Sequence, residues 1–159
     1  MSSLVVIGVS SSQVSSSPLQ ELDENVTQQL TIKGKGSQKV TMTGTFETTA
    51  APTSGKAKII EENGVRYLEI SSSFSTTEQA PDLHVLLDTV SQPPEEYDSS
   101  NSGRYVNLGS LQNTMGEQRY PIPDSVNLAD QKSVVVHCRM ANKTMGFASL
   151  EESKTALAE

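Results

Sequence analysis

Polar and apolar residues alternate most regularly between residues 40 and 46. Threonines occupy the odd positions of this stretch, and Val40, Met42, Gly44 and Phe46 occupy the even positions. A period of two places each set on its own face of an extended chain, which is typical of a half-buried strand. The stretch therefore predicts a strand with one face toward a core.

Two further β-rich runs, 56–62 and 65–71, flank the dipeptide Asn63-Gly64. Asn-Gly favours a two-residue hairpin turn, because both residues readily adopt the positive φ angles that such a turn requires. We expect a β-hairpin here.

Five more segments are short, contain β-forming residues and are separated by turn-forming residues. They cover 82–88, 103–108, 119–122, 133–140 and 144–149. Residues 128–131 are the best candidate for a single helical turn, and 150–159 for a short terminal helix. The pattern predicts an all-β, single-domain antiparallel β-sandwich or barrel-like fold of about 8–10 short strands.

The segments outside these strands lack a clear period. Residues 1–27 combine an apolar run, 4–9, with a serine-rich stretch. We expect a flexible leader or linker here, with the trimmed end of a secretion signal as the alternative. Residues 28–150 form the expected domain, and residues 151–159 form a C-terminal tail.

The net charge and the lengths of the apolar runs indicate which classes of partner the protein can bind. The 159 residues carry 12 Lys and Arg against 19 Asp and Glu, a formal net charge of -7, and the basic residues are scattered. Such a surface repels a phosphate backbone, so we expect no nucleic-acid partner. The expected folded part contains no run of the ~20 apolar residues that a membrane span needs. The oligomeric state stays open.

The single cysteine, Cys138, excludes an internal disulfide and a cysteine-rich zinc site. On the expected strand, Val134, Val136, Cys138 and Met140 share one face, which we expect to point inward. His137 then points to the other face and, unless the strand contains a bulge, cannot act with Cys138 as a base or as a second ligand. A buried free cysteine packs as a small hydrophobe, so a purely structural Cys138 is one interpretation.

Other candidates for chemistry are weak. His84 and Asp82 share the expected outer face of their strand, where two solvated side chains are favoured over a weakly bound metal ion. Asn142-Lys143-Thr144 fits the N-glycosylation pattern. The sequence contains no nucleophile elbow, phosphate loop or catalytic carboxylate pair. It therefore favours a protein that is not an enzyme by itself, and we expect no metal site.

Six short motifs follow one another along the chain. They are Gly44-Thr45-Phe46, then Pro81-Asp82-Leu83 with Val85, Leu108-Gly109 with Leu111, Tyr120 with Ile122 and Pro123, the stretch 133–138 that ends at Cys138, and Gly146-Phe147-Ala148. In this order they resemble the electron-transfer DM-thirteen domain family. The resemblance covers nearly all of the expected folded part, and the order of the motifs is more specific than any one of them.

The resemblance implies an extracytoplasmic β-rich module, periplasmic, secreted or on the cell surface, with a redox partner such as a cytochrome-like domain. It also implies that Cys138 is the redox centre, either as a bare thiol or as a ligand to a prosthetic group such as haem. Met140, expected on the same face, is a second candidate contact to a cofactor. A haem is not favoured, because four Tyr, three Phe and no Trp make an aromatic-lined pocket hard to build. His137 departs from the family, in which a bulky aromatic residue often holds this position.

Two classes of function stay open. The first is an electron-transfer or redox module that works through Cys138. The second is a non-catalytic interaction module of the adhesion type, in which loops such as 91–103 contact a partner and Cys138 only packs. The exposure of the sulfur atom and any cavity beside it distinguish the two.

Overall fold

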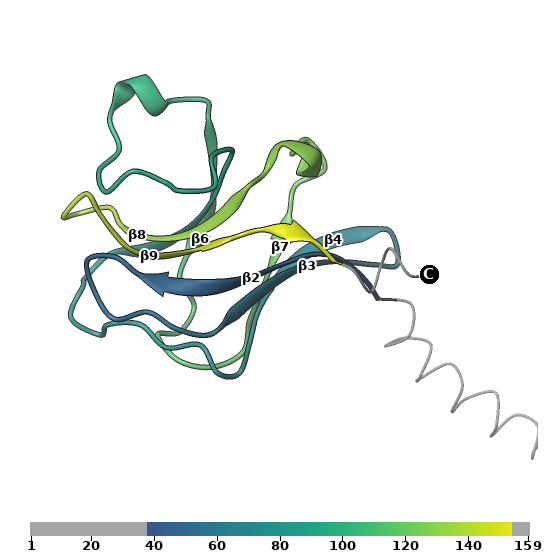
Figure 1. Ribbon diagram of the computed structural model, residues 1–159, viewed down its shortest axis with the longest axis horizontal. Helices are drawn as coiled ribbons and strands as arrows, with labels where there is room; N and C mark the ends of the chain where they lie inside the picture. The colour runs from purple at the N-terminus through teal and green to yellow at the C-terminus, as the bar shows by residue number, and fades with distance from the viewer. Residues whose placement is uncertain (1–37, 154–159) are drawn as a thin grey trace, which may run out of the picture. The chain divides into compact units, whose positions relative to one another are not determined.

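Backbone hydrogen bonds join nine antiparallel strands into one sheet within residues 38–153, the part of the chain that this computed structural model describes (Figure 1). The strands are β2 (Lys39–Thr48), β3 (Lys56–Glu62), β4 (Val65–Ile70), β5 (Leu83–Asp88), β6 (Tyr105–Ser110), β7 (Gln118–Ile122), β8 (Ser133–Cys138), β9 (Lys143–Ser149) and β10 (Glu151–Glu152). Their order in the sheet is β6-β5-β8-β9-β2-β3-β4-β7, and β10 pairs with β2 beside this path. The expected leader and the expected domain start at residue 28 lie outside the described residues.

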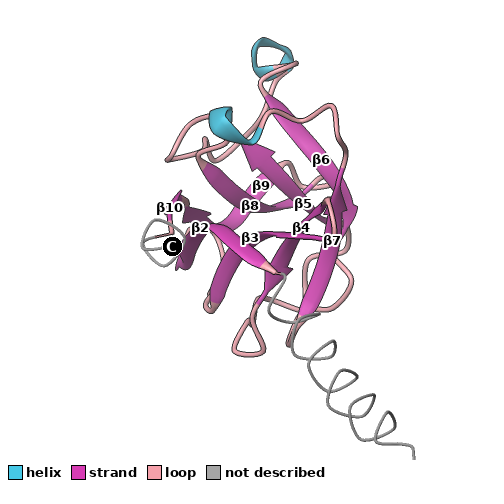
Figure 2. Ribbon diagram, turned by 90° about the vertical axis from the view of Figure 1, so that its right-hand side faces the viewer, coloured by secondary structure: helices cyan, strands magenta, loops and turns pink. Residues whose placement is uncertain are grey.

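The sheet curves until its two edge strands, β6 and β7, approach each other (Figure 2). The hydroxyl of Tyr120 in β7 accepts a hydrogen bond of 2.8 Å from the backbone N–H of Gln112, which follows β6. The result is a nearly closed antiparallel barrel, so the predicted all-β fold is confirmed. No helix within 38–153 is long and apolar enough to cross a membrane.

Local sequence signals explain most element boundaries. Asn63 and Gly64 have φ angles of 54° and 82°, and they join β3 to β4 with Glu62 opposite Val65, as the hairpin signal predicts. Each predicted strand begins and ends within two residues of an observed one. The predicted helical turn is a short 3-10 helix, Leu128–Asp130.

The predicted terminal helix is wrong for the residues that the structure describes. Glu151 and Glu152 form β10 and pair with Thr43 and Met42 of β2. Because β9 pairs only with the end of β2, at residues 46–48, the earlier part of that edge is open to another strand. Residues 154–159 lie outside the described part.

Alternate residues of the strands fill the barrel with aliphatic side chains. Ile59, Leu68, Val85, Val134 and Val136 are completely buried in one cluster. Phe46 and Phe74 join the cluster edge to face, with their ring centroids 5.1 Å apart. This cluster is the core that the period-two pattern predicts.

Strands β5 and β8 are buried on both faces, which the sequence did not indicate. All six residues of each strand are buried, including Leu86 and Val135, which lie outside the core cluster. The chain after β5, residues 89–104, folds back over this outer face, and we call it the covering loop (Figure 1, teal to green above β8). The hydroxyl of Ser133 donates to the carbonyl of Val90 at 2.8 Å and fixes the start of the loop.

Candidate functional site

Cys138 is the last residue of β8 and directly precedes the turn over 139–142. Its backbone pairs with Leu83 of β5 and Lys143 of β9. None of its surface is exposed, and its side chain belongs to the core cluster. The predicted inward orientation of Cys138 is confirmed.

Met140 does not share this interior. The strand ends at Cys138, and Met140 lies in the turn with 72% of its surface exposed. The backbone N–H of Asn142 donates to the carbonyl of Arg139 at 3.2 Å, so the chain reverses before the strand alternation reaches residue 140. The expectation that Met140 lines the same face as Cys138 is therefore wrong.

The surroundings of Cys138 do not fit a thiolate-bound haem. A haem needs an apolar cavity at the sulfur atom, whereas Cys138 is fully enclosed by the core cluster. A groove of about 750 Å³ is present on the barrel, but Cys138 is not among the residues that line it. Nor do residues 38–153 bring together three or more His, Cys, Asp or Glu side chains that could hold a metal ion.

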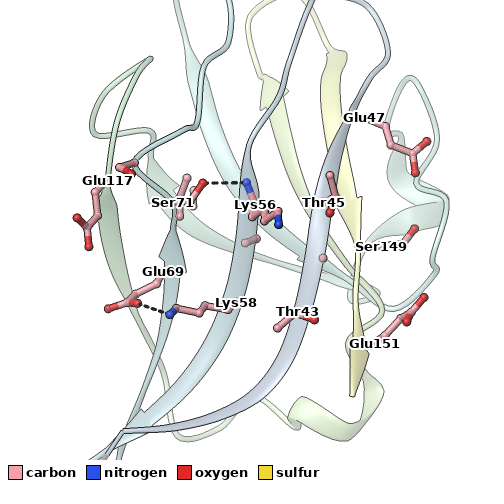
Figure 3. Close-up of a pocket in the computed structure, with 14 residues that line it drawn as sticks. Thr43, Thr45, Glu47, Lys56, Lys58, Glu69, Ser71, Glu117, Ser149 and Glu151 are labelled. Carbon is pink, nitrogen blue, oxygen red and sulfur yellow. Dashed lines mark hydrogen bonds and ion pairs between the residues drawn. The ribbon is translucent and has the colours of Figure 1, made fainter. Parts of the chain in front are cut away.

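The groove lies on the outer face of β2, β3 and β4 (Figure 3). Lys56 and Lys58 point into it because they alternate with the buried residues Ala57 and Ile59. Hydroxyl and carboxylate groups, together with Gly44, Ala57 and Ile70, complete the lining. The Nζ atom of Lys58 lies 3.7 Å from a carboxylate oxygen of Glu69. The groove is thus a mixed polar and apolar surface feature that Cys138 does not reach.

His137 lies on the opposite face of β8 from Cys138, as the strand alternation predicts. It is 4% exposed, with Nε2 3.1 Å from Oδ1 of Asn142 and Nδ1 3.3 Å from Oγ1 of Thr144. Burial lowers the pKa of His137 below its ordinary value, the hydrogen bond to Asn142 partly opposes this shift, and nearby His84 adds to it. The shift favours the neutral form of the imidazole.

A buried carboxylate lies near His137 beneath the covering loop. Asp88, the last residue of β5, is completely buried and accepts a hydrogen bond of 2.6 Å from the hydroxyl of Tyr97. The guanidinium of Arg104 donates to both Asp88 oxygens, each at 3.0 Å. Burial and the hydrogen bond to Asp88 raise the pKa of Tyr97 far above its ordinary value, and the hydrogen bond to Asp88 also raises the pKa of Arg104. The group is thus a neutral phenol, a carboxylate and a guanidinium cation.

The ring of Tyr97 lies between two other rings. The ring of Tyr105 packs edge-on against it at 4.8 Å between centroids, and the ring of His137 does so at 4.9 Å. Tyr97 and Tyr105 are both partly exposed, so this arrangement extends from the buried carboxylate to the surface. We call Tyr97, Asp88, Arg104, Tyr105 and His137 the tyrosine cluster.

The turn after Cys138 holds the covering loop in place. Asn142 accepts a hydrogen bond from the backbone N–H of Tyr97 and donates one to the carbonyl of Tyr97, both at 3.0 Å. The hydroxyl of Thr144 donates to the carbonyl of Pro94 at 2.8 Å. The backbone N–H of Thr144 donates to the carbonyl of Glu95, also at 2.8 Å. These hydrogen bonds therefore join the covering loop to the turn that follows β8 and to the start of β9.

His84 is also buried, contrary to the expectation of a solvated outer face. It is 8% exposed, with Nε2 3.1 Å from Oδ1 of Asp82 and Nδ1 3.2 Å from Oδ1 of Asn107. Arg139 approaches the same Nε2 atom at 3.4 Å. These neighbours occupy both ring nitrogens, because β6 and the turn after β8 lie against this face.

The tyrosine cluster was missed by sequence reasoning. Asp88 ends a largely apolar strand, and Tyr97 and Arg104 occur in a polar loop segment. The one available signal in the sequence was a carboxylate, Asp88, at the end of a predicted strand, followed after the next loop by the pair Arg104-Tyr105. Such a signal does not specify which partner the carboxylate selects.

Comparisons with known proteins give one match. A family model described as "Electron transfer DM13" matches residues 45–150, which agrees with the resemblance found in the sequence. Searches of curated proteins and of solved structures gave no match.

Proposed function

Because the chain belongs to the electron-transfer DM13 family, we propose that it exchanges electrons with a redox partner in an extracytoplasmic compartment, with Cys138 as the reacting group. The observation that carries the proposal is the position of Cys138. It is the only thiol of the chain, and it lies at the end of its strand, directly before a turn. In this proposal, opening of the turn exposes the sulfur atom to solvent.

The reaction that fits a single thiol is exchange with a disulfide of a partner protein. The Cys138 thiolate attacks one partner sulfur, a new S–S bond forms, the partner S–S bond breaks, and the second partner sulfur leaves as a thiolate. Cys138 becomes oxidised, and the released sulfur becomes reduced. A dithiol of a second, reduced protein completes the transfer: its first thiolate attacks the Cys138 sulfur and the partner leaves with both thiols reduced, and its second thiolate then releases Cys138 as the donor's own disulfide forms.

Disulfide chemistry also supports the proposed compartment. Disulfides persist in the periplasm, at cell surfaces and outside cells, whereas cytosolic thiol systems keep them reduced. The apolar run at residues 4–9 is compatible with the end of a secretion signal. Cell fractionation of the natural host tests this part directly, and a purely cytosolic protein would contradict it.

The thiol proposal is tested by labelling native protein with a chromogenic aromatic disulfide, which stands in for the partner disulfide. We expect slow labelling by local opening, and faster labelling in Asn142→Ala, which loses both hydrogen bonds between the turn and Tyr97. Asn113→Ala, at an exposed position distant in sequence from the turn, is the matched control. Cys138→Ala provides the blank.

A second candidate function is favoured by the complete burial of Cys138. In this case the domain is a non-catalytic interaction module, and the thiol only fills the core. Labelling that requires global unfolding in both the wild type and Asn142→Ala would support this candidate and reject thiol exchange. Denaturant dependence separates the two cases, because local opening depends weakly on denaturant and global unfolding depends strongly on it.

A further inference from the structure

We propose that Tyr97 is a second, thiol-independent redox site, which gives one electron to a strong one-electron oxidant while its phenolic proton moves to Asp88. The oxidant class is a high-valent metal centre of a partner, or an equally strong outer-sphere acceptor. The inference goes beyond the proposed role of Cys138 and does not depend on it.

The first support is the geometry of the phenol. Removing an electron from a tyrosine makes its hydroxyl proton strongly acidic, so the loss is easiest where an acceptor for that proton is already in place. The oxygen of Tyr97 lies 2.6 Å from Oδ2 of Asp88, a charge-assisted hydrogen bond along which the proton can move. Asp88 is completely buried, so the proton has a defined destination within the protein.

The second support is the charge balance. Before oxidation the group contains a neutral phenol, the Asp88 carboxylate and the Arg104 cation, with a net charge of zero. Afterwards it contains a neutral phenoxyl radical, a protonated Asp88 and the same cation, with a net charge of +1. The side chain of Arg104 is 31% exposed, so water can reach it and solvate the charge that remains.

The third support is the path to the surface. Tyr105 lies against Tyr97 with a centroid distance of 4.8 Å, and both rings are partly exposed, so an acceptor at the surface can approach them closely. The ring of His137 also packs edge to face with the ring of Tyr97, with 4.9 Å between the centroids. By contrast, Tyr120 is 2% exposed, and Tyr67 lies under the guanidinium of Arg119 at 4.6 Å. Neither of these tyrosines has a hydrogen bond to a carboxylate among the described contacts.

The oxidation of Tyr97 moves one electron out of the protein and one proton within it. Tyr97 loses one electron to the oxidant, which is reduced by one electron, and the O–H bond of Tyr97 breaks as a new O–H bond forms on Asp88. Reduction of the radical by a donor reverses both transfers, and the proton returns to the phenol. No atom leaves the protein during the cycle.

The test is photo-oxidation of the full chain with a ruthenium polypyridyl complex and a sacrificial electron acceptor, followed by freeze-quenching and electron paramagnetic resonance. We expect a tyrosyl radical in the wild type and the loss of most of this signal in Tyr97→Phe, which keeps the ring and removes the hydroxyl. Tyr67→Phe is the matched control and should keep the signal. A signal that persists in Tyr97→Phe overturns the proposal.

A measurement on the wild type keeps the proposal testable if Tyr97→Phe does not fold. Since the proton moves to Asp88, the rate of radical formation should be slower in D₂O and independent of buffer concentration. A rate that rises with buffer concentration shows that the proton leaves to solvent, which also overturns the proposal. Cys138→Ala should give the wild-type signal, so the two redox proposals can fail separately.

Discussion

Asp88 shows at the scale of single residues how the barrel accommodates a buried charge. Its carboxylate has no exposed surface, and Tyr97 and Arg104 supply three hydrogen bonds to it. A charge in such a place is tolerated only while its partners remain, since burial removes its hydration. The ion pair between Asp88 and Arg104 therefore keeps the covering loop on the sheet.

We predict that Arg104→Ala lowers the free energy of unfolding by about 3–5 kcal/mol, because it leaves the buried carboxylate without its cation. Urea unfolding followed by circular dichroism measures the change. Lys143→Ala is the control, since its ion pair with Glu96 is exposed on both sides and should contribute little. Equal effects of the two variants would show that Asp88 does not depend on Arg104.

Gly146 gives a second prediction at this scale. A Cβ atom at this position would lie 2.5 Å from Cβ of Thr53 and 2.6 Å from the carbonyl oxygen of Glu47. Gly146→Ala should therefore cost about 1–3 kcal/mol through overpacking where β9 meets β2. Thermal unfolding checks this against Ser110→Ala, an exposed position where we expect almost no change.

At the scale of elements, β8 has different surroundings on its two faces. One face ends in Cys138 within the core cluster, and the other carries His137 beneath the covering loop. The turn over 139–142 lies between the two faces and holds the loop through Asn142. A change in the charge of His137 therefore acts on the same hydrogen bonds that hold the turn closed.

We predict that the domain loses stability as the pH falls below about 6.5, the ordinary pKa of histidine. The pKa of His137 is lowered in the folded state, so the unfolded chain binds this proton first and unfolding becomes more favourable. Above that pH the residue contributes no pH dependence. Urea unfolding at several pH values measures the slope, and His137→Gln should reduce it. An unchanged slope would contradict the assignment to His137.

The prediction of elements from sequence succeeded where the pattern was local. The Asn63-Gly64 turn and the threonine alternation around residues 40–46 depend on neighbouring residues alone, and both gave strands in the right places. The inward direction of Cys138 followed from the same alternation. Met140 was misplaced because the pattern does not show where a strand stops.

The candidate site was less predictable because its contacts are not local. The hydroxyl of Tyr97 meets Asp88 only after the covering loop has folded back over β5 and β8. From an alternating pattern, the second face of a strand is predicted to be exposed to solvent. Neither Val135 nor His84 indicates in the sequence that a loop covers this face. A sequence pattern records periodicity, whereas this second buried layer depends on the path of the chain.

At the scale of the whole described domain, pairing between distant segments dominates. Phe46 and Ala148, which lie about 100 residues apart in the chain, pair across β2 and β9, and β2 also pairs with β10. The long chain segment between such partners must be brought together before they can pair, and this requirement slows folding.

We therefore predict that the domain refolds in milliseconds to seconds, in the range of other all-β barrels. Stopped-flow dilution from urea, followed by tyrosine fluorescence, measures this rate. Ala148→Gly, which weakens packing where β9 pairs with β2, should mainly speed unfolding if this pairing forms late. A slower refolding rate would instead place the pairing in the transition state.

The two hydrogen bonds between Asn142 and Tyr97 affect how this protein folds in different expression hosts. The side-chain nitrogen of Asn142, the atom to which an N-linked sugar would attach, donates a hydrogen bond to Tyr97 in the folded domain. A glycan added to the nascent chain would therefore prevent the covering loop from closing. Expression in a eukaryotic secretory host should yield an unglycosylated native fraction and a glycosylated fraction with an open loop, whereas a bacterial host should yield only the first.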